Sequence, residues 1–194
     1  MTVAKSIPSP TPATYQDIID LPEHLVGEIV DGELIVSPRP TPRHARASSV
    51  AGMDLGSPFD RKPGDPRGPG GWWIYDEPEL HFGKRILVPD LAGWRRERMP
   101  SRPETAWFEL PPDWVCEVVS PGTVRHDRVK KARIYLEEGV EWFWLVNPTE
   151  QSVEVLHNEN GRWVLIDNWV GDDAEAKIPP FDAVALDLGR WWEG

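Results

Sequence analysis

Two acidic residues lie inside apolar runs of the sequence, where an unpaired charge is costly. Asp90 follows Pro89 within residues 86–94, and Glu117 lies in the middle of residues 114–120. Both runs are short, rich in β-branched residues and bounded by turn residues, so they predict buried strands. A buried carboxylate needs a cationic partner, a metal ion or a raised pKa. Two such acids on neighbouring strands would begin an active site.

A basic segment after the second acidic strand supplies a candidate cation. Asp127, Lys131 and Tyr135 recur at every fourth residue and so share one face of a helix predicted over residues 124–138. If this face packs on the sheet, Lys131 can reach both carboxylates. Two acids and a lysine suit magnesium-assisted phosphodiester hydrolysis. Hard oxygen ligands hold the metal, the metal activates a bound water, and a cation stabilises the transition-state charge.

A predicted β-hairpin over residues 27–36 contributes a third acid. Asp31-Gly32 is a two-residue turn of the type that needs positive φ at both positions. Period two places Glu28 on the same face as Val30, Glu33 and Ile35, while Ile29, Leu34 and Val36 occupy the other face. Glu28 is therefore the acid of this hairpin that is hardest to explain as a surface residue that only adds solubility.

The remaining elements predict a mixed α/β (α+β) fold in one domain spanning residues 14–194, after a disordered tail over residues 1–13. Thr14 and Asp17 predict a capping box at the start of a short helix, and Pro42 opens a helix over residues 41–59 that carries His44. Strands are predicted over residues 72–75, 79–82, 86–94, 114–120, 142–146, 152–157 and 162–166, with a short strand or turn over 185–188. Strand 114–120, the basic helix and strand 142–146 form a βαβ unit.

Composition limits the class of protein. Apolar residues make up 40% and charged residues 27% of 194 residues, which is ordinary for a globular protein. The sequence has no apolar run of membrane-spanning length and no signal peptide, so we expect a cytoplasmic protein with no membrane partner. Cys116 is the single cysteine, which excludes a disulfide framework and predicts a small core residue.

The net charge of −11 argues against a general nucleic-acid binder held by phosphate contacts. Bound divalent cations would add positive charge locally, and basic side chains also gather in three places. They are Arg39, Arg43 and Arg46; Arg95, Arg96 and Arg98; and Arg125, Arg128, Lys130, Lys131 and Arg133. A local basic patch on an otherwise acidic surface is the expectation.

Several short motifs occur in the order in which a known family has them. They are Tyr15-Gln16-Asp17, Glu28-Ile29-Val30-Asp31-Gly32-Glu33-Leu34, Ser37-Pro38 with Arg43-His44, Val88-Pro89-Asp90, Cys116-Glu117-Val118-Val119-Ser120-Pro121, Asp127 to Lys131 to Tyr135, and Gly139-Val140 to Trp144-Leu145-Val146. The ordered set, which covers roughly residues 14–190, resembles the Uma-type putative restriction endonuclease family, a branch of the PD-(D/E)XK nuclease superfamily.

The resemblance implies a restriction-endonuclease-like mixed β-sheet core with flanking helices and extra β-hairpins. It also implies a nuclease (hydrolase) with DNA as substrate and Mg²⁺ as cofactor, with Mn²⁺ as a substitute. Asp90 and Glu117 would be the metal ligands and Glu28 a third acid. The superfamily has a catalytic lysine two residues after the second acid, where this sequence has Val119. Lys131 matches the helix lysine that replaces it in this family.

Four further residues are candidates for substrate binding: His44, Arg43, Arg128 and Tyr135. Plainer interpretations remain open for the whole set. Asp90 could cap a turn, Glu28 could face water, and His44 and Tyr135 could be structural. Lys131 could form a solvated helix pair with Asp127, worth only about 0.2–0.5 kcal/mol.

Three hypotheses for function follow. The first is a metal-dependent nuclease. The second is a catalytically lapsed module that keeps the fold to bind nucleic acid or a protein partner, a hypothesis motivated by the displaced lysine and the acidic charge. The third is a homo-oligomeric regulatory protein, a dimer in its simplest form. It rests on a self-association surface predicted from Trp72, Trp73, Trp191 and Trp192 near the chain's Trp-rich segments.

Overall fold

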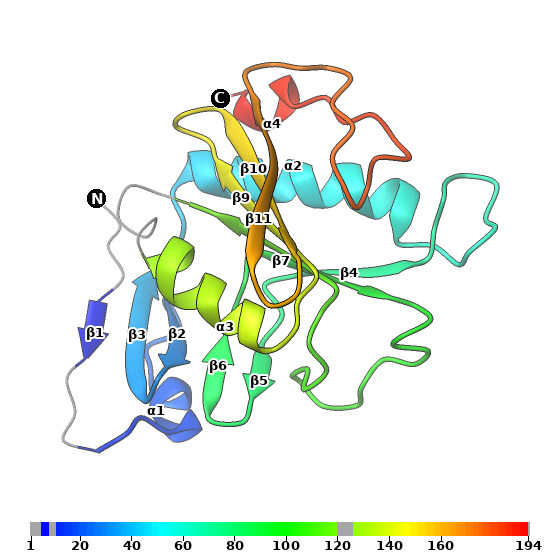
Figure 1. Ribbon diagram of the computed structural model, residues 1–194. Helices are drawn as coiled ribbons and strands as arrows, with labels where there is room; N and C mark the ends of the chain where they lie inside the picture. The colour runs from blue at the N-terminus through cyan, green and yellow to red at the C-terminus, as the bar shows by residue number, and fades with distance from the viewer. Residues whose placement is uncertain (1–4, 8–10, 120–125, 194) are drawn as a thin grey trace.

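Two β-sheets meet at the centre of the computed structural model (Figure 1). The structure describes residues 5–7, 11–119 and 126–193, with the backbone alone at 126–128. The first sheet has five strands in the order β1 (Lys5–Ile7), β3 (Glu33–Pro38), β2 (Leu25–Val30), β6 (Arg85–Leu87) and β5 (Leu80–Phe82). The second has six, in the order β11 (Trp163–Val170), β10 (Ser152–Asn158), β9 (Trp142–Asn147), β8 (Trp114–Val118), β7 (Leu91–Arg95) and β4 (Trp72–Asp76). The predicted α+β class is confirmed.

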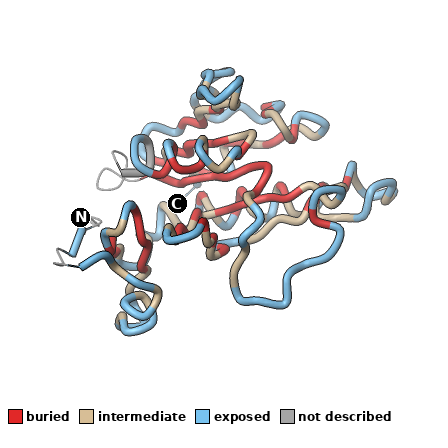
Figure 2. The backbone as a smooth tube through the Cα atoms, turned by 60° about the horizontal axis from the view of Figure 1, so that its bottom comes forward, coloured by how far each residue is buried: buried red, intermediate tan, exposed pale blue. Residues whose placement is uncertain are grey.

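Helices cover both faces of the second sheet. On one face lies α2 (Pro42–Phe59); on the other lies α3 (Ala132–Glu137), which continues a π-helical segment over His126–Lys131 (Figure 1). The strands β8 and β9 pair in parallel around this second helix, as the predicted βαβ unit requires. Buried stretches run through the centre of the molecule and long connections are exposed (Figure 2).

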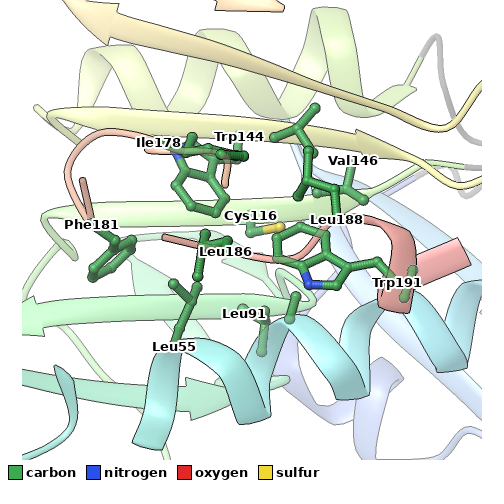
Figure 3. Packing of buried hydrophobic residues seen from close by; sticks show 14 of the residues in the cluster. Leu55, Leu91, Cys116, Trp144, Val146, Ile178, Phe181, Leu186, Leu188 and Trp191 are labelled. Atoms are coloured by element: carbon green, nitrogen blue, oxygen red, sulfur yellow. The ribbon is translucent and has the colours of Figure 1, made fainter. Parts of the chain in front are cut away.

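The α2 face holds the larger core. The C-terminal segment packs over this face of the sheet with Phe181, Leu186, Leu188 and Trp191, and ends in α4 (Gly189–Trp192), which was not predicted (Figure 3). Cys116 lies fully buried among these residues, as expected of a core cysteine. Burial raises the pKa of its thiol, and the charges of Asp90 and Glu117 raise it further. Glu117 is the next residue of this strand, and Asp90 contacts it through the Val118 N–H.

The hairpin β2–β3 has the predicted register and faces. Asp31 and Gly32 have φ of 52° and 83°, and Val30 pairs with Glu33. Ile29 and Leu34 pack in a small core of their own, beneath α1 (Tyr15–Ile19), whereas Val30 and Ile35 join the core on the α3 side. The alternation of side chains thus directs Glu28 inward, and it is buried.

Residues 86–94 do not form the single strand that was predicted. They split into β6 in the first sheet and β7 in the second, and Val88-Pro89-Asp90 crosses between them. Proline has no N–H to donate to a ladder, so Pro89 ends pairing at this point. The crossing places Asp90 at the junction of the two sheets.

Other predictions need smaller corrections. The tail predicted to be disordered contains β1, which pairs with the edge of β3, and all three of its residues are exposed. The last hairpin strand, β11, extends to Val170. The first two residues of the predicted basic helix, 124 and 125, lie outside the described residues. The predicted capping interaction is present, since the Thr14 N–H donates to Asp17 Oδ2 at 2.7 Å.

The predicted tryptophan surface is absent. Trp72 is 6% and Trp191 0% exposed, because both side chains fill the core on the α2 face, and Trp73 and Trp192 are half-buried. Within the described ranges, no helix combines the length and the apolar character needed to cross a membrane.

Candidate active site

Asp90 lies at the entrance of β7, held from two sides. Its Oδ2 accepts the N–H of Val118 at 2.7 Å, and its Oδ1 lies 2.5 Å from His44 Nε2. The carboxylate therefore lies toward α2, which carries His44. Strict period-two alternation over the predicted strand 86–94 groups Asp90 with Val88 and Ala92, and Ala92 packs in the core on the α3 side. The Asp90 side chain departs from this alternation because the strand begins only at Leu91.

Glu117 lies opposite Asp90 on the adjacent strand. The β7–β8 ladder ends where Leu91 pairs with Cys116, and the Val118 N–H donates to Asp90 Oδ2, so the backbones at Asp90 and Glu117 lie next to each other. The side chain of Glu117 is 4% exposed and points to the α3 face. There its Oε1 accepts the Tyr135 hydroxyl at 2.6 Å and lies 2.7 Å from Lys131 Nζ.

Lys131 joins two acids from two different sheets. Its ammonium lies 2.9 Å from Glu28 Oε1 as well as 2.7 Å from Glu117 Oε1, and all three side chains are more than nine-tenths buried. The same oxygen of Glu28 accepts the Val88 N–H at 2.8 Å. Glu28 thus holds the segment that leads into Asp90. A buried pair of carboxylates around one ammonium is tolerable because charge and hydrogen bonds compensate desolvation.

A cleft of about 480 Å³ opens on the α2 side of Asp90. Besides His44 and Asp90, its walls include Asp76 and Glu77 at the end of β4, and Gly52 of α2. A Cβ at Gly52 would lie 3.0 Å from Asp76 Oδ1, so this carboxyl lies against the helix although the residue as a whole is exposed. Desolvation there raises the pKa of Asp76.

The structure brings most of the predicted site residues together. Glu28, Glu117, Lys131 and Tyr135 form one buried cluster, and Asp90 with His44 forms the adjoining wall of the cleft. The prediction that Lys131 reaches two carboxylates is confirmed for Glu117, but its second described partner is Glu28 where Asp90 was expected. Arg43 is exposed on α2. The side chains of Asp127 and Arg128 lie outside the described residues.

Sequence reasoning missed Asp76 and Glu77. They directly follow a predicted strand, and a pair of acids at a strand end next to Pro78 is the signal that could have identified them. Their proximity to Asp90 depends on the pairing of β4 with β7, which the sequence does not display. In the structure Asp76 pairs with Leu91, the neighbour of Asp90.

The pair of strand acids fits a hard divalent cation. In the described part of the chain, no group of three or more His, Cys, Asp or Glu side chains is arranged to hold a metal ion by itself. Mg²⁺, however, is commonly held by one or two carboxylates together with waters and substrate phosphates. Asp90 and Glu117 each supply one carboxylate of this kind from neighbouring strands, Asp90 on the side of α2 and Glu117 on the side of α3.

Comparison with known proteins agrees with this geometry. A solved structure described as a putative nuclease belonging to DUF820 from Anabaena variabilis is similar to this chain with a TM-score of 0.71 and 25% identity, covering 93% of this chain and 98% of that one. No curated protein matches. A family model described as Uma2, putative restriction endonuclease, matches residues 13–188. The chain therefore belongs to the Uma2 family of putative restriction endonucleases.

Proposed function

We propose that this protein is a divalent-metal-dependent endonuclease that hydrolyses phosphodiester bonds of DNA. The observation that carries the proposal is the juxtaposition of Asp90 and Glu117 on paired strands, with the buried ammonium of Lys131 at 2.7 Å from Glu117. Family membership and the similarity to a nuclease structure support the reaction class.

Each residue has a role that its contacts suggest. Asp90 and Glu117 would hold Mg²⁺, or Mn²⁺ in its place, and the metal would supply Lewis acidity and activate a water. Lys131 stabilises negative charge that develops on the phosphoryl group. His44 orients Asp90 through Oδ1, and Tyr135 orients Glu117 through Oε1. Glu28 positions Lys131 and, through the Val88 N–H, the segment that leads into Asp90.

A second candidate function is a lapsed nuclease that binds nucleic acid or a protein without cleavage. The specific observation in its favour is that Lys131 forms ion pairs with both Glu28 and Glu117. An ammonium engaged by two carboxylates neutralises the negative charge that would otherwise attract a metal cation.

Metal-dependent cleavage is the direct test. We expect purified protein to cut plasmid or single-stranded DNA in Mg²⁺ or Mn²⁺ and to lose this activity when EDTA removes the metal. The same preparation should release heat when titrated with Mn²⁺ in a calorimeter. Neither heat nor cleavage of any DNA or RNA would contradict the nuclease proposal and favour the binding module.

We also infer a homodimer, with β11 as its contact. This strand ends the six-stranded sheet, and its outer edge pairs with no other described strand. Four of the nine large hydrophobic residues that are exposed in the described chain lie on its eight residues: Val164, Leu165, Ile166 and Val170. Asp167 is its single charged residue, so two copies of an acidic chain meet here with little repulsion.

Leu165→Lys is expected to convert this dimer to monomer, because a lysine on an edge strand opposes pairing with a second strand. Leu165 is 55% exposed, so the substitution leaves the core unchanged. Sedimentation velocity over a series of concentrations measures the effect. Leu110→Lys, at the other exposed leucine (36%), is the matched control and should stay dimeric. A wild-type chain that is monomeric at every concentration would refute the proposal.

A further inference from the structure

A hollow of about 820 Å³ lies beside the candidate active site, between the end of β4 and residues 101–106. Three aromatic side chains line it: Trp73, Tyr75 and Phe108. All three are half-buried, so each offers part of its ring to the hollow. Aromatic walls around a space of this size suit a flat, partly apolar ligand.

The aromatic walls are fixed in place. The Trp73 indole N–H donates to the Met99 carbonyl at 3.0 Å. Arg96 covers one face of this ring, with its guanidinium carbon 3.3 Å from the ring centroid. Tyr75 packs against Phe108 with ring centroids 4.9 Å apart. Because these rings are held by their neighbours, a ligand that stacks on them needs little rearrangement.

Arg102 is the basic residue that lines the hollow, and its side chain lies within hydrogen-bonding reach of the Tyr75 hydroxyl. Its guanidinium carbon lies 5.4 Å from the Trp73 ring centroid. Its exposed side chain forms no salt bridge with the described residues. Its neighbours differ: Arg96 pairs with Asp60 at 2.7 Å and Arg98 with Asp113 at 2.8 Å. Arg102 can therefore move onto a stacked ligand without breaking an ion pair.

The hollow adjoins the cleft that contains Asp90. Asp76 and Glu77 line both spaces. The Glu77 N–H donates to the Asp90 carbonyl at 3.0 Å, which fixes the shared wall to the candidate metal ligand. A polymer whose phosphate lies at Asp90 would thus present its neighbouring group to the aromatic walls.

Carboxylates in the hollow indicate which part of a nucleotide enters. The lining has one basic residue, Arg102, and four acidic ones: Asp76, Glu77, Glu79 and Glu104. This excess of acids repels a phosphate, whereas carboxylate oxygens accept hydrogen bonds from the exocyclic amino groups of cytosine, adenine and guanine. The neutral base is therefore the favoured occupant and the sugar–phosphate backbone is not.

We propose that this hollow binds one unpaired nucleobase of the strand whose phosphodiester lies at Asp90. The inference rests on the proposed nuclease function and names its substrate class: single-stranded DNA, or a duplex from which a base is extruded. A base stacked inside a duplex cannot reach the walls. Arg102 and Trp73 would hold the base from its faces, by cation–π contact and stacking.

The test compares binding of three labelled probes in Ca²⁺: a single-stranded oligodeoxynucleotide, the same strand with abasic residues, and its duplex. We expect the wild type to bind the normal strand about tenfold more tightly than either other probe. Arg102→Ala and Trp73→Leu should weaken binding of the normal strand about tenfold and leave the abasic strand unchanged. Arg98→Ala, on the same segment, is the matched control and should behave as wild type.

Equal binding of the normal and abasic strands by the wild type would overturn the base site. Unchanged binding by Arg102→Ala would do the same, and this variant keeps the result interpretable if Trp73→Leu does not fold, since Arg102 is exposed. Cleavage is scored separately. Cleavage without base discrimination refutes only the base site, and discrimination without metal-dependent cleavage refutes only the nuclease.

Discussion

Asp90→Asn is expected to lower the rate of metal-dependent DNA cleavage roughly a thousandfold and to abolish the heat of Mn²⁺ binding. A neutral amide is a poor ligand for a hard cation, so the substitution removes the charge that holds the metal. The amide oxygen can still accept a hydrogen bond from the Val118 N–H, which in the wild type donates to Asp90 Oδ2 at 2.7 Å. Circular dichroism should therefore show an intact fold, with a change in unfolding free energy of about 1 kcal/mol.

The control for this prediction is Asp65→Asn. Asp65 is an aspartate of the loop between α2 and β4 whose described contact is an ion pair with Arg67 at 2.9 Å. The substitution removes the same charge from a residue that does not line the cleft. Cleavage and Mn²⁺ binding should match the wild type. Asp90→Asn that cleaves at the wild-type rate would exclude Asp90 as a metal ligand, and the lapsed-module interpretation would then be favoured.

Local sequence patterns predicted the parts of the fold that local chemistry determines. The Asp31-Gly32 turn, the alternation that buries Glu28 and the β-branched runs of β8 and β9 are all readable because each depends on residues close together in the chain. The same holds for Glu117, whose apolar neighbours on both sides indicated burial. The structure confirms that burial at 3% exposure.

The contacts that assemble the site depend on pairings that no local pattern contains. Glu28 and Lys131 meet because the first sheet docks on the α3 face. No pattern in the residues between them predicts that docking. Pro89 gave the missed signal for the crossing between sheets, since a proline inside an apparent central strand argues against one continuous strand. Asp76 was missed because its relation to Asp90 follows from the β4–β7 register.

The crossing has a functional consequence. Val88 belongs to the segment between the sheets, and its N–H and carbonyl contact Glu28 and Lys131 at 2.8 and 3.4 Å. Asp90, two residues later, contacts α2 through His44. The candidate metal ligands are thus held by elements from both sheets and both helical layers. A change in how the sheets dock would move Asp90 relative to Glu117.

Lys131→Met is expected to destabilise the fold by about 3–5 kcal/mol, measured by urea or thermal unfolding. Methionine preserves most of the side-chain volume but removes the ammonium between Glu28 and Glu117. Two buried carboxylates would then face each other without their shared cation, which is the costly way to break a buried ion pair. Cleavage should fall as well, because the charge-stabilising group is lost.

Lys130→Met separates this effect from the loss of any basic residue. Lys130 is the adjacent residue, half-exposed and 3.3 Å from Glu33, so its removal should cost at most about 1 kcal/mol. Adding Glu28→Gln to Lys131→Met should recover part of the lost stability, because one of the two uncompensated charges disappears. Mn²⁺ should also stabilise Lys131→Met by binding the carboxylates that the ammonium has left. Equal losses for Lys130→Met and Lys131→Met, with no recovery from Glu28→Gln, would mean that the buried cluster does not depend on its lysine.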